Sequence, residues 1–303
     1  MYEGFPPELV AGLRCPLDSG TLQLTAEVRF RESVRNGTLT CVVCQTAYPI
    51  AEGIATLFDP STLDSVSRHE LERRDGGAEK DNFEWERSTL SQMEVIPVME
   101  ALRPLKGMVV LELGCGKGRF TTVLAKESMS VIAVDFSLAV LRRLASRIGP
   151  GSCVGLVQGD CTKPIAATAS VQRVLSTLVS NLPTSEHRRA MHRLAATALS
   201  PEGKFVFTAH HHGLKQRFRN APQQGHYPES GIFRYLLRRS EIIEECGECF
   251  ERIRCRPIQV TLPVLDRIGF QAVRISRVAE RLPIVNQLGE LLMAVGERPR
   301  QPR

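Results

Sequence analysis

Long apolar runs are missing from this chain of 303 residues, and no stretch approaches the roughly 20 apolar residues that a membrane-spanning helix needs. The first residues, Met1 to Pro7, also lack the basic region followed by an apolar region that marks an export signal. Without such a signal, nine cysteines are typical of metal ligands and buried thiols rather than disulfides. These absences predict an intracellular, cytoplasmic protein with no transmembrane segment.

Aromatic residues are also few, at 6% with one tryptophan, and charge of either sign is not concentrated in a block. The net charge of +6 comes from 39 basic and 33 acidic residues spread along the chain. Surfaces that bind single-stranded RNA usually combine clustered Lys and Arg with interleaved aromatics. The composition therefore permits an anionic substrate or RNA but does not favour RNA. The length favours two domains, one of them small.

The most informative segment is 109–118, VVLELGCGKG, in which an apolar strand ends in a glycine-rich turn that opens a helix. A Cβ at Gly114 or Gly116 would block a ligand from lying against the backbone of the turn. Gly118 allows the following helix to pack closely on the strand. The N–H groups at the start of that helix suit an anionic ligand end such as a carboxylate.

The spacing of these glycines excludes one class of nucleotide site and favours another. Nicotinamide dinucleotide sites need G-x-G-x-x-G, but Arg119 occupies the position of the third glycine. The chain has instead Glu112 two residues before Gly114, followed by G-x-G-x-G. This loop resembles that of class I S-adenosylmethionine-dependent methyltransferases. The resemblance implies S-adenosylmethionine as the cofactor.

Two further acids follow predicted strands in the order of that family. Strand 130–135 ends at Asp135, and strand 154–159 is followed by Asp160. The resemblance implies that Asp135 holds the ribose and that Asp160 approaches the adenine amino group. An Asp at a strand end is also commonly a helix cap, and Cys115 and Cys161 are typical small space-filling residues rather than nucleophiles. The predicted cofactor-binding residues are Glu112, Gly114, Cys115, Gly116, Gly118, Asp135, Phe136, Asp160 and Cys161.

Alternating strand and helix patterns over residues 96–303 predict an α/β fold. The resemblance implies a Rossmann-like, doubly wound sheet of seven strands, with the sixth at 254–262 and an antiparallel seventh at 289–297. A helical insertion at about 264–288 carries several arginines, and either caps the acceptor site or rests on a membrane surface as a peripheral contact. Residues 61–95 are predicted to form a linker and N-terminal helices.

Residues 1–60 are predicted to form a separate β-rich domain. They contain two ligand pairs, Cys15 with Asp18 and Cys41 with Cys44, each pair separated by two residues, a spacing that surrounds a tetrahedral zinc ion. The segment resembles small zinc-ribbon proteins that activate tRNA and release-factor methyltransferases, although Asp18 stands where that family has cysteine. The predicted alternatives are a zinc site at these four residues, or a ribbon without an ion that is held together by apolar packing.

The acceptor is less clearly indicated than the cofactor. Three consecutive histidines, 210–212, follow the fifth strand. Successive side chains of a strand point to opposite faces, so the three cannot share one metal ion, and His210 is predicted as the general base. The pattern resembles small-molecule methyltransferases of the quinone-biosynthesis type, which implies transfer to carbon or oxygen of a lipidic or secondary-metabolite acceptor. The alternatives are an RNA methyltransferase with a zinc-ribbon substrate-binding domain, and a non-catalytic cofactor-binding scaffold or partner of another methyltransferase.

Overall fold

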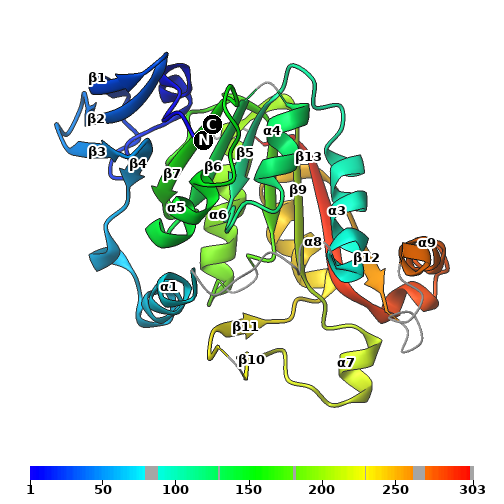
Figure 1. Cartoon of the computed structure of the whole chain (residues 1–303). Helices are drawn as coiled ribbons and strands as arrows, with labels where there is room; N and C mark the ends of the chain where they lie inside the picture. The colour runs from blue at the N-terminus through cyan, green and yellow to red at the C-terminus, as the bar shows by residue number, and fades with distance from the viewer. Residues whose placement is uncertain (79–87, 129, 180–181, 229, 262–269, 301–303) are drawn as a thin grey trace.

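The computed structural model describes residues 1–303 except 79–87, 129, 180–181, 229, 262–269 and 301–303. Within the described residues, one sheet contains 11 strands in the order β1-β2-β3-β4-β7-β6-β5-β8-β9-β13-β12 (Figure 1). The strands of this sheet are β1 (Leu22–Phe30), β2 (Ser33–Cys41), β3 (Ala47–Ala51), β4 (Ile54–Leu57), β5 (Val109–Leu113), β6 (Ser130–Asp135), β7 (Val154–Gly159), β8 (Val171–Thr177), β9 (Leu199–His210), β12 (Phe250–Val260) and β13 (Gly289–Pro299).

The seven strands from β7 to β12 form the doubly wound sheet that the sequence predicts. Strands β5 to β9 are parallel, while β13 is antiparallel to both of its neighbours, β9 and β12. The sixth strand, β12, begins at Phe250 rather than at Arg254, because Phe250 pairs with Pro299 and extends the ladder. The strand order reverses between β5 and β8, and ligands of such sheets bind beyond the carboxyl ends of the strands at this point.

The four N-terminal strands extend this sheet rather than forming one of their own. β1 to β4 are an antiparallel meander, and β4 pairs in parallel with β7 from Ile54 opposite Leu156 to Leu57 opposite Gly159. Phe5 packs over Gly155, where a Cβ would lie 2.9 Å from the ring. The N-terminal segment therefore joins the rest of the chain through main-chain pairing and a shared apolar core.

Helices cover both faces of the sheet (Figure 1). The α-helices are α1 (Ser65–Gly77), α3 (Thr89–Leu102), α4 (Thr121–Glu127), α5 (Leu138–Ala145), α6 (Ser185–Ala198), α7 (Leu214–Phe218), α8 (Arg239–Gly247) and α9 (Phe270–Ala279). A short hairpin, β10 (Gln224–His226) and β11 (Phe233–Tyr235), stands apart from the main sheet. In the described part of the chain, every helix is too short or too polar to cross a membrane.

Two predicted helical regions lie at opposite edges of the molecule (Figure 1). In the predicted linker, α1 is capped by Asp64, whose carboxylate accepts the Val66 and Ser67 main-chain N–H groups. In the predicted insertion, α9 and the short helix η5 (Val285–Leu288) pack beside β12, and α9 also contacts α3. Residues 79–87 of the linker and 264–269 of the insertion lie outside the described residues.

Candidate functional site

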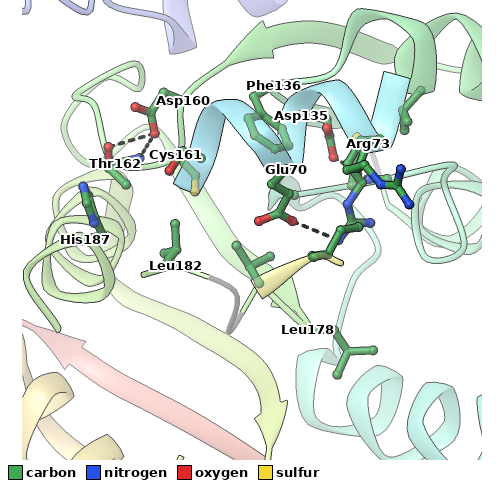
Figure 2. A pocket seen from close by; sticks show the side chains of 18 of the residues that line it. Glu70, Arg73, Asp135, Phe136, Asp160, Cys161, Thr162, Leu178, Leu182 and His187 are labelled. Atoms are coloured by element: carbon green, nitrogen blue, oxygen red, sulfur yellow. Dashed lines mark hydrogen bonds and ion pairs between the residues drawn. The ribbon is translucent and has the colours of Figure 1, made fainter. Parts of the chain in front are cut away.

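A cavity of about 900 Å³ lies at the carboxyl ends of the parallel strands. Its wall includes the turn after β5, the ends of β6 to β9, one side of α1 and the loop between β10 and β11. Figure 2 shows part of this wall, with residues from α1 beside those that follow β6 and β7. Seven of the nine predicted cofactor-binding residues line the cavity: Gly114, Cys115, Gly116, Asp135, Phe136, Asp160 and Cys161.

The three glycines of the turn have positive φ angles of +73°, +54° and +86°, which favour glycine over other residues. At Gly114 a Cβ would lie 2.5 Å from Val179 Cγ2, and at Gly118 it would lie 2.1 Å from Leu144 Cδ1. At Gly116 a Cβ would meet no described atom within 4 Å. Gly118 therefore serves the packing of α5, whereas Gly116 presents bare backbone to the cavity.

The Asp135 carboxylate is held by main-chain N–H groups on both sides. Oδ2 accepts the Gly116 N–H at 2.9 Å and Oδ1 accepts the Ser137 N–H at 3.0 Å, while burial raises the pKa of Asp135. The cap of α5 is Ser137, whose hydroxyl accepts the Val140 N–H. Asp135 is thus not the helix cap that the alternative interpretation of this acid requires, and its carboxylate is fixed against the glycine turn.

Glu112 lies beneath the turn rather than on the cavity wall. It is 2% exposed, its Oε2 accepts the Thr121 hydroxyl at 2.7 Å, and burial raises its pKa to about 8. Burial also raises the pKa of the Cys115 and Cys161 thiols well above the ordinary value. These thiols stay protonated at neutral pH and act as small space-filling side chains rather than nucleophiles.

The residues after β6 and β7 form the next part of the wall. Asp160 Oδ1 accepts both the main-chain N–H and the hydroxyl of Thr162 at 2.8 Å, as the dashed lines in Figure 2 show. The Phe136 carbonyl accepts the Gln158 side-chain amide at 3.1 Å, and this bond ties the turn after β6 to β7. Phe136 and Cys161 therefore place an aromatic ring and a thiol beside two carboxylates, Asp135 and Asp160.

His210 is the residue of the histidine run that lines the cavity. Its Nε2 is hydrogen-bonded to the Tyr227 hydroxyl, and burial lowers its pKa to about 4, so the imidazole is neutral at pH 7. His211 Nδ1 bonds instead to the Gly289 carbonyl at 2.8 Å, and His212 bonds to the Ala221 carbonyl. The predicted divergence of the consecutive histidines is confirmed.

Tyr227 and the polar side chains of α1 are cavity residues that no sequence motif indicated. Glu70, Arg73 and Arg74 line the cavity from α1, although this helix buries none of its residues. Arg73 donates to the Ser230 carbonyl at 2.6 Å and so connects α1 to the loop before β11, while Arg74 pairs with Glu70. A charge-rich helix is usually a solvated one, and only the folded chain places it over the cavity.

Arg119, at the position where a dinucleotide-binding loop has glycine, is a further unpredicted wall residue. Its guanidinium lies 2.6 Å from the Glu94 carboxylate and stacks 4.6 Å from the Phe120 ring centroid. Glu94 is fully buried in α3, and its Oε1 accepts the Thr208 hydroxyl at 2.6 Å. The network holds a cation in a defined position beside the glycine turn.

A second cluster lies in the N-terminal strands and brings together all four predicted metal ligands. The ligand atoms of Cys15, Asp18, Cys41 and Cys44 lie within 4.8 Å of one another. The Cys15 and Cys44 sulfurs are 3.7 Å apart, and Cys41 Sγ lies 3.3 Å from Asp18 Oδ1. Cys15 and Cys41 belong to the same buried apolar core as Leu13, Leu22, Leu39, Ile50 and Leu57.

Comparisons with known proteins identify the central segment. Residues 110–203 match a family model described as "Methyltransferase domain". Phosphoethanolamine N-methyltransferase 3 of Arabidopsis thaliana is 39% identical over 77 residues, which are 25% of this chain and 16% of that protein. Phosphoethanolamine N-methyltransferase of Triticum aestivum is 27% identical over 168 residues, 54% of this chain and 32% of that protein. The matched segments thus span about a third or less of these relatives.

Solved structures support the fold over a longer part of the chain. An S-adenosylmethionine-dependent methyltransferase of Mesorhizobium loti has a TM-score of 0.51 at 18% identity, covering 69% of this chain and 98% of that chain. The N-methyltransferase NodS of Bradyrhizobium japonicum, with bound S-adenosyl-l-homocysteine, has a TM-score of 0.54 at 14% identity, covering 78% and 100%. A complex of the Haloferax volcanii Trm112 methyltransferase activator with a putative methyltransferase has a TM-score of 0.50 at 15% identity, covering 79% and 100%. The chain therefore has the Rossmann-like fold of S-adenosylmethionine-dependent methyltransferases, with a methyltransferase domain at residues 110–203.

Proposed function

We propose that this protein is an S-adenosylmethionine-dependent methyltransferase that acts on a small-molecule acceptor. The observation that carries the proposal is one continuous cavity with two chemically different parts. One part has the bare backbone of Gly116 and the fixed carboxylate of Asp135, and the other has the neutral His210 and its partner Tyr227. Such a cavity provides for a nucleotide cofactor and for a second reactant beside it.

The wall residues of the first part fit S-adenosylmethionine. Asp135 is a carboxylate that accepts hydrogen bonds, as ribose hydroxyls require, and Gly116 leaves open space where any other residue would place a Cβ. The Arg119 guanidinium lies beside the turn and is held there by the buried Glu94 carboxylate. When bound, S-adenosylmethionine supplies a methyl group on a positively charged sulfur.

The contribution of the chain to methyl transfer is mainly position and exclusion of water, since positive charge disappears in an in-line displacement. α1 and the loop before β11, joined by Arg73 and the Ser230 carbonyl, cover the cavity. We propose that His210 accepts the proton that the acceptor loses, and that Tyr227 orients its ring. The imidazole is neutral and can accept a proton, but burial lowers its pKa to about 4, so it is a weak base. It therefore suits a proton that becomes strongly acidic as the methyl group is transferred.

Two lines of support bear on the acceptor atom, and they favour different atoms. The resemblance in the sequence favours carbon or oxygen of a lipidic or secondary-metabolite acceptor, and the apolar wall residues Leu178, Leu182 and Ile232 suit such a molecule. The curated relatives are named as N-methyltransferases of phosphoethanolamine. Small amines therefore belong in the first acceptor panel beside phenols and quinols.

The test begins with calorimetric titration of S-adenosylhomocysteine into the purified protein, followed by transfer of a labelled methyl group to amines, phenols, quinols and RNA. We expect one-to-one micromolar binding and transfer to a small molecule. His210→Ala should lower the transfer rate while the affinity for S-adenosylhomocysteine stays unchanged. Absence of binding would overturn the proposal. Binding without transfer would favour the scaffold alternative, and transfer to RNA alone would favour the RNA methyltransferase.

We also propose that Cys15, Asp18, Cys41 and Cys44 hold a structural zinc ion. Zinc–thiolate bonds of about 2.3 Å place two sulfurs of one tetrahedron ~3.8 Å apart, and the Cys15 and Cys44 sulfurs are separated by 3.7 Å. Elemental analysis of the wild-type protein should find one equivalent of zinc. A protein without stoichiometric zinc would leave the ribbon held by its apolar packing alone.

A further inference from the structure

Helix α9 has a buried side and an apolar side that faces solvent. Ala272, Val273 and Ser276 are at most 2% exposed where the helix packs against α3 and β12. On the other side, Ile275 is 40% exposed and Val278 is 61% exposed. Because its inner side is well packed, α9 is firmly attached to the protein, and the exposed apolar residues need another explanation.

The exposed apolar residues continue beyond α9. In the turn that follows it, Leu282 is 50% exposed and Ile284 is 80% exposed, and Phe218 at the end of α7 is 82% exposed. α7 packs against η5, which begins directly after Ile284, so these residues belong to neighbouring elements. We define the α7–α9 face as the exposed apolar residues Phe218, Ile275, Val278, Leu282 and Ile284 with the basic residues of the same segments.

The charge on these segments is almost entirely positive. Residues 214–219 and 270–288 contain six basic residues and one acidic residue, Glu280. Glu280 is 5% exposed, and its carboxylate is engaged by Arg256 at 3.1 Å and by the Gln259 N–H at 3.0 Å. The cations are Lys215, Arg217, Arg219, Arg274, Arg277 and Arg281.

Two of these cations have acidic partners on other elements. Lys215 pairs with Glu290, and Arg277 lies 2.6 Å from Glu100 of α3. Arg217 and Arg219 are exposed beside Phe218, and Arg274 and Arg281 are exposed beside the apolar residues of α9. The face therefore combines protruding apolar side chains with a surrounding positive charge.

We propose that the α7–α9 face docks on a bilayer that contains anionic phospholipids. Apolar side chains that protrude from a basic surface enter the boundary between headgroups and acyl chains, while arginines meet the negative surface potential. This inference does not rest on the proposed function, because docking requires neither cofactor nor methyl transfer. His210, which lines the cavity, is four residues before the start of α7, so the α7–α9 face is close in the chain to the cavity wall.

The end of β1 and the turn into β2 provide a matched control surface at the other edge of the sheet. Val28 is 48% exposed and Phe30 is 51% exposed there, so its apolar exposure is comparable. Its arginines, Arg29 and Arg31, are flanked by the acids Glu27 and Glu32, so their charges balance. Anionic lipid should therefore not favour this turn.

The test is co-sedimentation of the full chain with vesicles of phosphatidylglycerol and phosphatidylcholine, compared with phosphatidylcholine alone. We expect the wild-type protein to bind only the anionic vesicles, with binding that weakens as salt is raised. The double variant Val278→Ser, Ile284→Ser should lose most of this binding. Arg274→Gln and Arg281→Gln should each lower the partition coefficient about fivefold. Val28→Ser, Phe30→Ser should bind like the wild type.

Several outcomes would overturn the proposal. One is that the wild-type protein stays in the supernatant with anionic vesicles. Another is that the Val278→Ser, Ile284→Ser variant binds these vesicles as well as the wild type does. A third is that the Val28→Ser, Phe30→Ser control loses as much binding as that variant. Concentration-dependent dimerisation in sedimentation velocity, abolished by Val278→Ser with Ile284→Ser, would show that the face binds a second copy instead. Thermal unfolding and S-adenosylhomocysteine titration of each variant separate a docking defect from a folding defect or a failed cofactor site.

Discussion

The cofactor-side cavity and the cysteine cluster are both built from turns at strand ends, but different parts of the chain supply their polar groups. In the cavity, the backbone is decisive, because glycines with positive φ form the turn and main-chain N–H groups hold Asp135. In the cluster, four side chains from two turns converge, while the apolar core and the pairing of β4 with β7 hold the strands. The comparison indicates that the two sites respond independently to substitution.

The largest effect is expected for Asp135→Ala. Losing an acceptor of two ribose hydrogen bonds should weaken S-adenosylhomocysteine binding by at least about 100-fold, since each hydrogen bond to a charged group contributes ~1.5–3 kcal/mol. Calorimetric titration measures the loss, and the zinc content should stay unchanged. The protein should still fold, with a lower Tm, because the Gly116 and Ser137 N–H groups lose their acceptor. Affinity within a few-fold of the wild type would refute the role of this carboxylate.

A pair of glycine variants separates packing from ligand access within the cavity region. Gly118→Ala should destabilise the protein by roughly 3 kcal/mol, because strain at positive φ adds to the contact with Leu144. Gly116→Ala should cost only about 1 kcal/mol of strain, because its Cβ would meet no atom of the described residues within 4 Å. The variant should nevertheless weaken cofactor binding, because that Cβ would occupy space in the cavity proposed for the cofactor. Urea unfolding and calorimetry test both variants, and equal unfolding free energies would contradict this division of roles.

Removal of a metal ligand tests the other side of the comparison. Cys41→Ser should abolish zinc binding and lower the Tm by a few degrees, since ~1 kcal/mol corresponds to about 2–4 °C in domains of this size class. The affinity for S-adenosylhomocysteine should stay within about twofold of the wild type if the sites are independent. Cys153→Ser, at a cysteine outside the cluster, is the matched control. A large fall in affinity would show that the ribbon positions α1 over the cavity.

The last prediction concerns a slope rather than an affinity or a Tm: Glu112→Gln should change the pH dependence of stability. Burial raises the pKa of Glu112 from 4.5 to about 8, so the folded state keeps a proton that the unfolded state releases. This contribution to stability is complete below pH 4.5 and declines as the pH rises toward 8. In the Glu112→Gln variant the unfolding free energy should decline less steeply with pH. The difference in slope should be smaller than ~1.4 kcal/mol per pH unit, the value for release of one full proton. If the unfolding free energy, measured with urea at each pH, falls equally with pH in both proteins, Glu112 does not titrate in this way.

Local patterns predicted much of the architecture and part of the site. The strand positions follow from apolar periodicity, and the glycine turn follows from the positive φ that only glycine adopts easily. The seven-stranded sheet and the antiparallel β13 are implied by the resemblance to class I methyltransferases. The positions of Asp135 and Asp160 at the ends of β6 and β7 follow from strand boundaries alone. Tyr227 and Glu70 carried no local signal, because their place on the cavity wall depends on how a hairpin and a polar helix fold over the sheet.

By itself, the sequence determined the fold class, through the alternation of strand and helix patterns over residues 96–303. It also determined the glycine turn with its neighbouring acids and the four candidate zinc ligands, since each of these depends on spacing within short segments. The tertiary structure decided that β4 pairs with β7, that Gly118 packs against Leu144 of α5 rather than, as predicted, against the following helix, and that α9 keeps apolar residues exposed. These outcomes depend on contacts between residues far apart in the chain. Local spacing carries no information about which distant surface a strand or helix will meet.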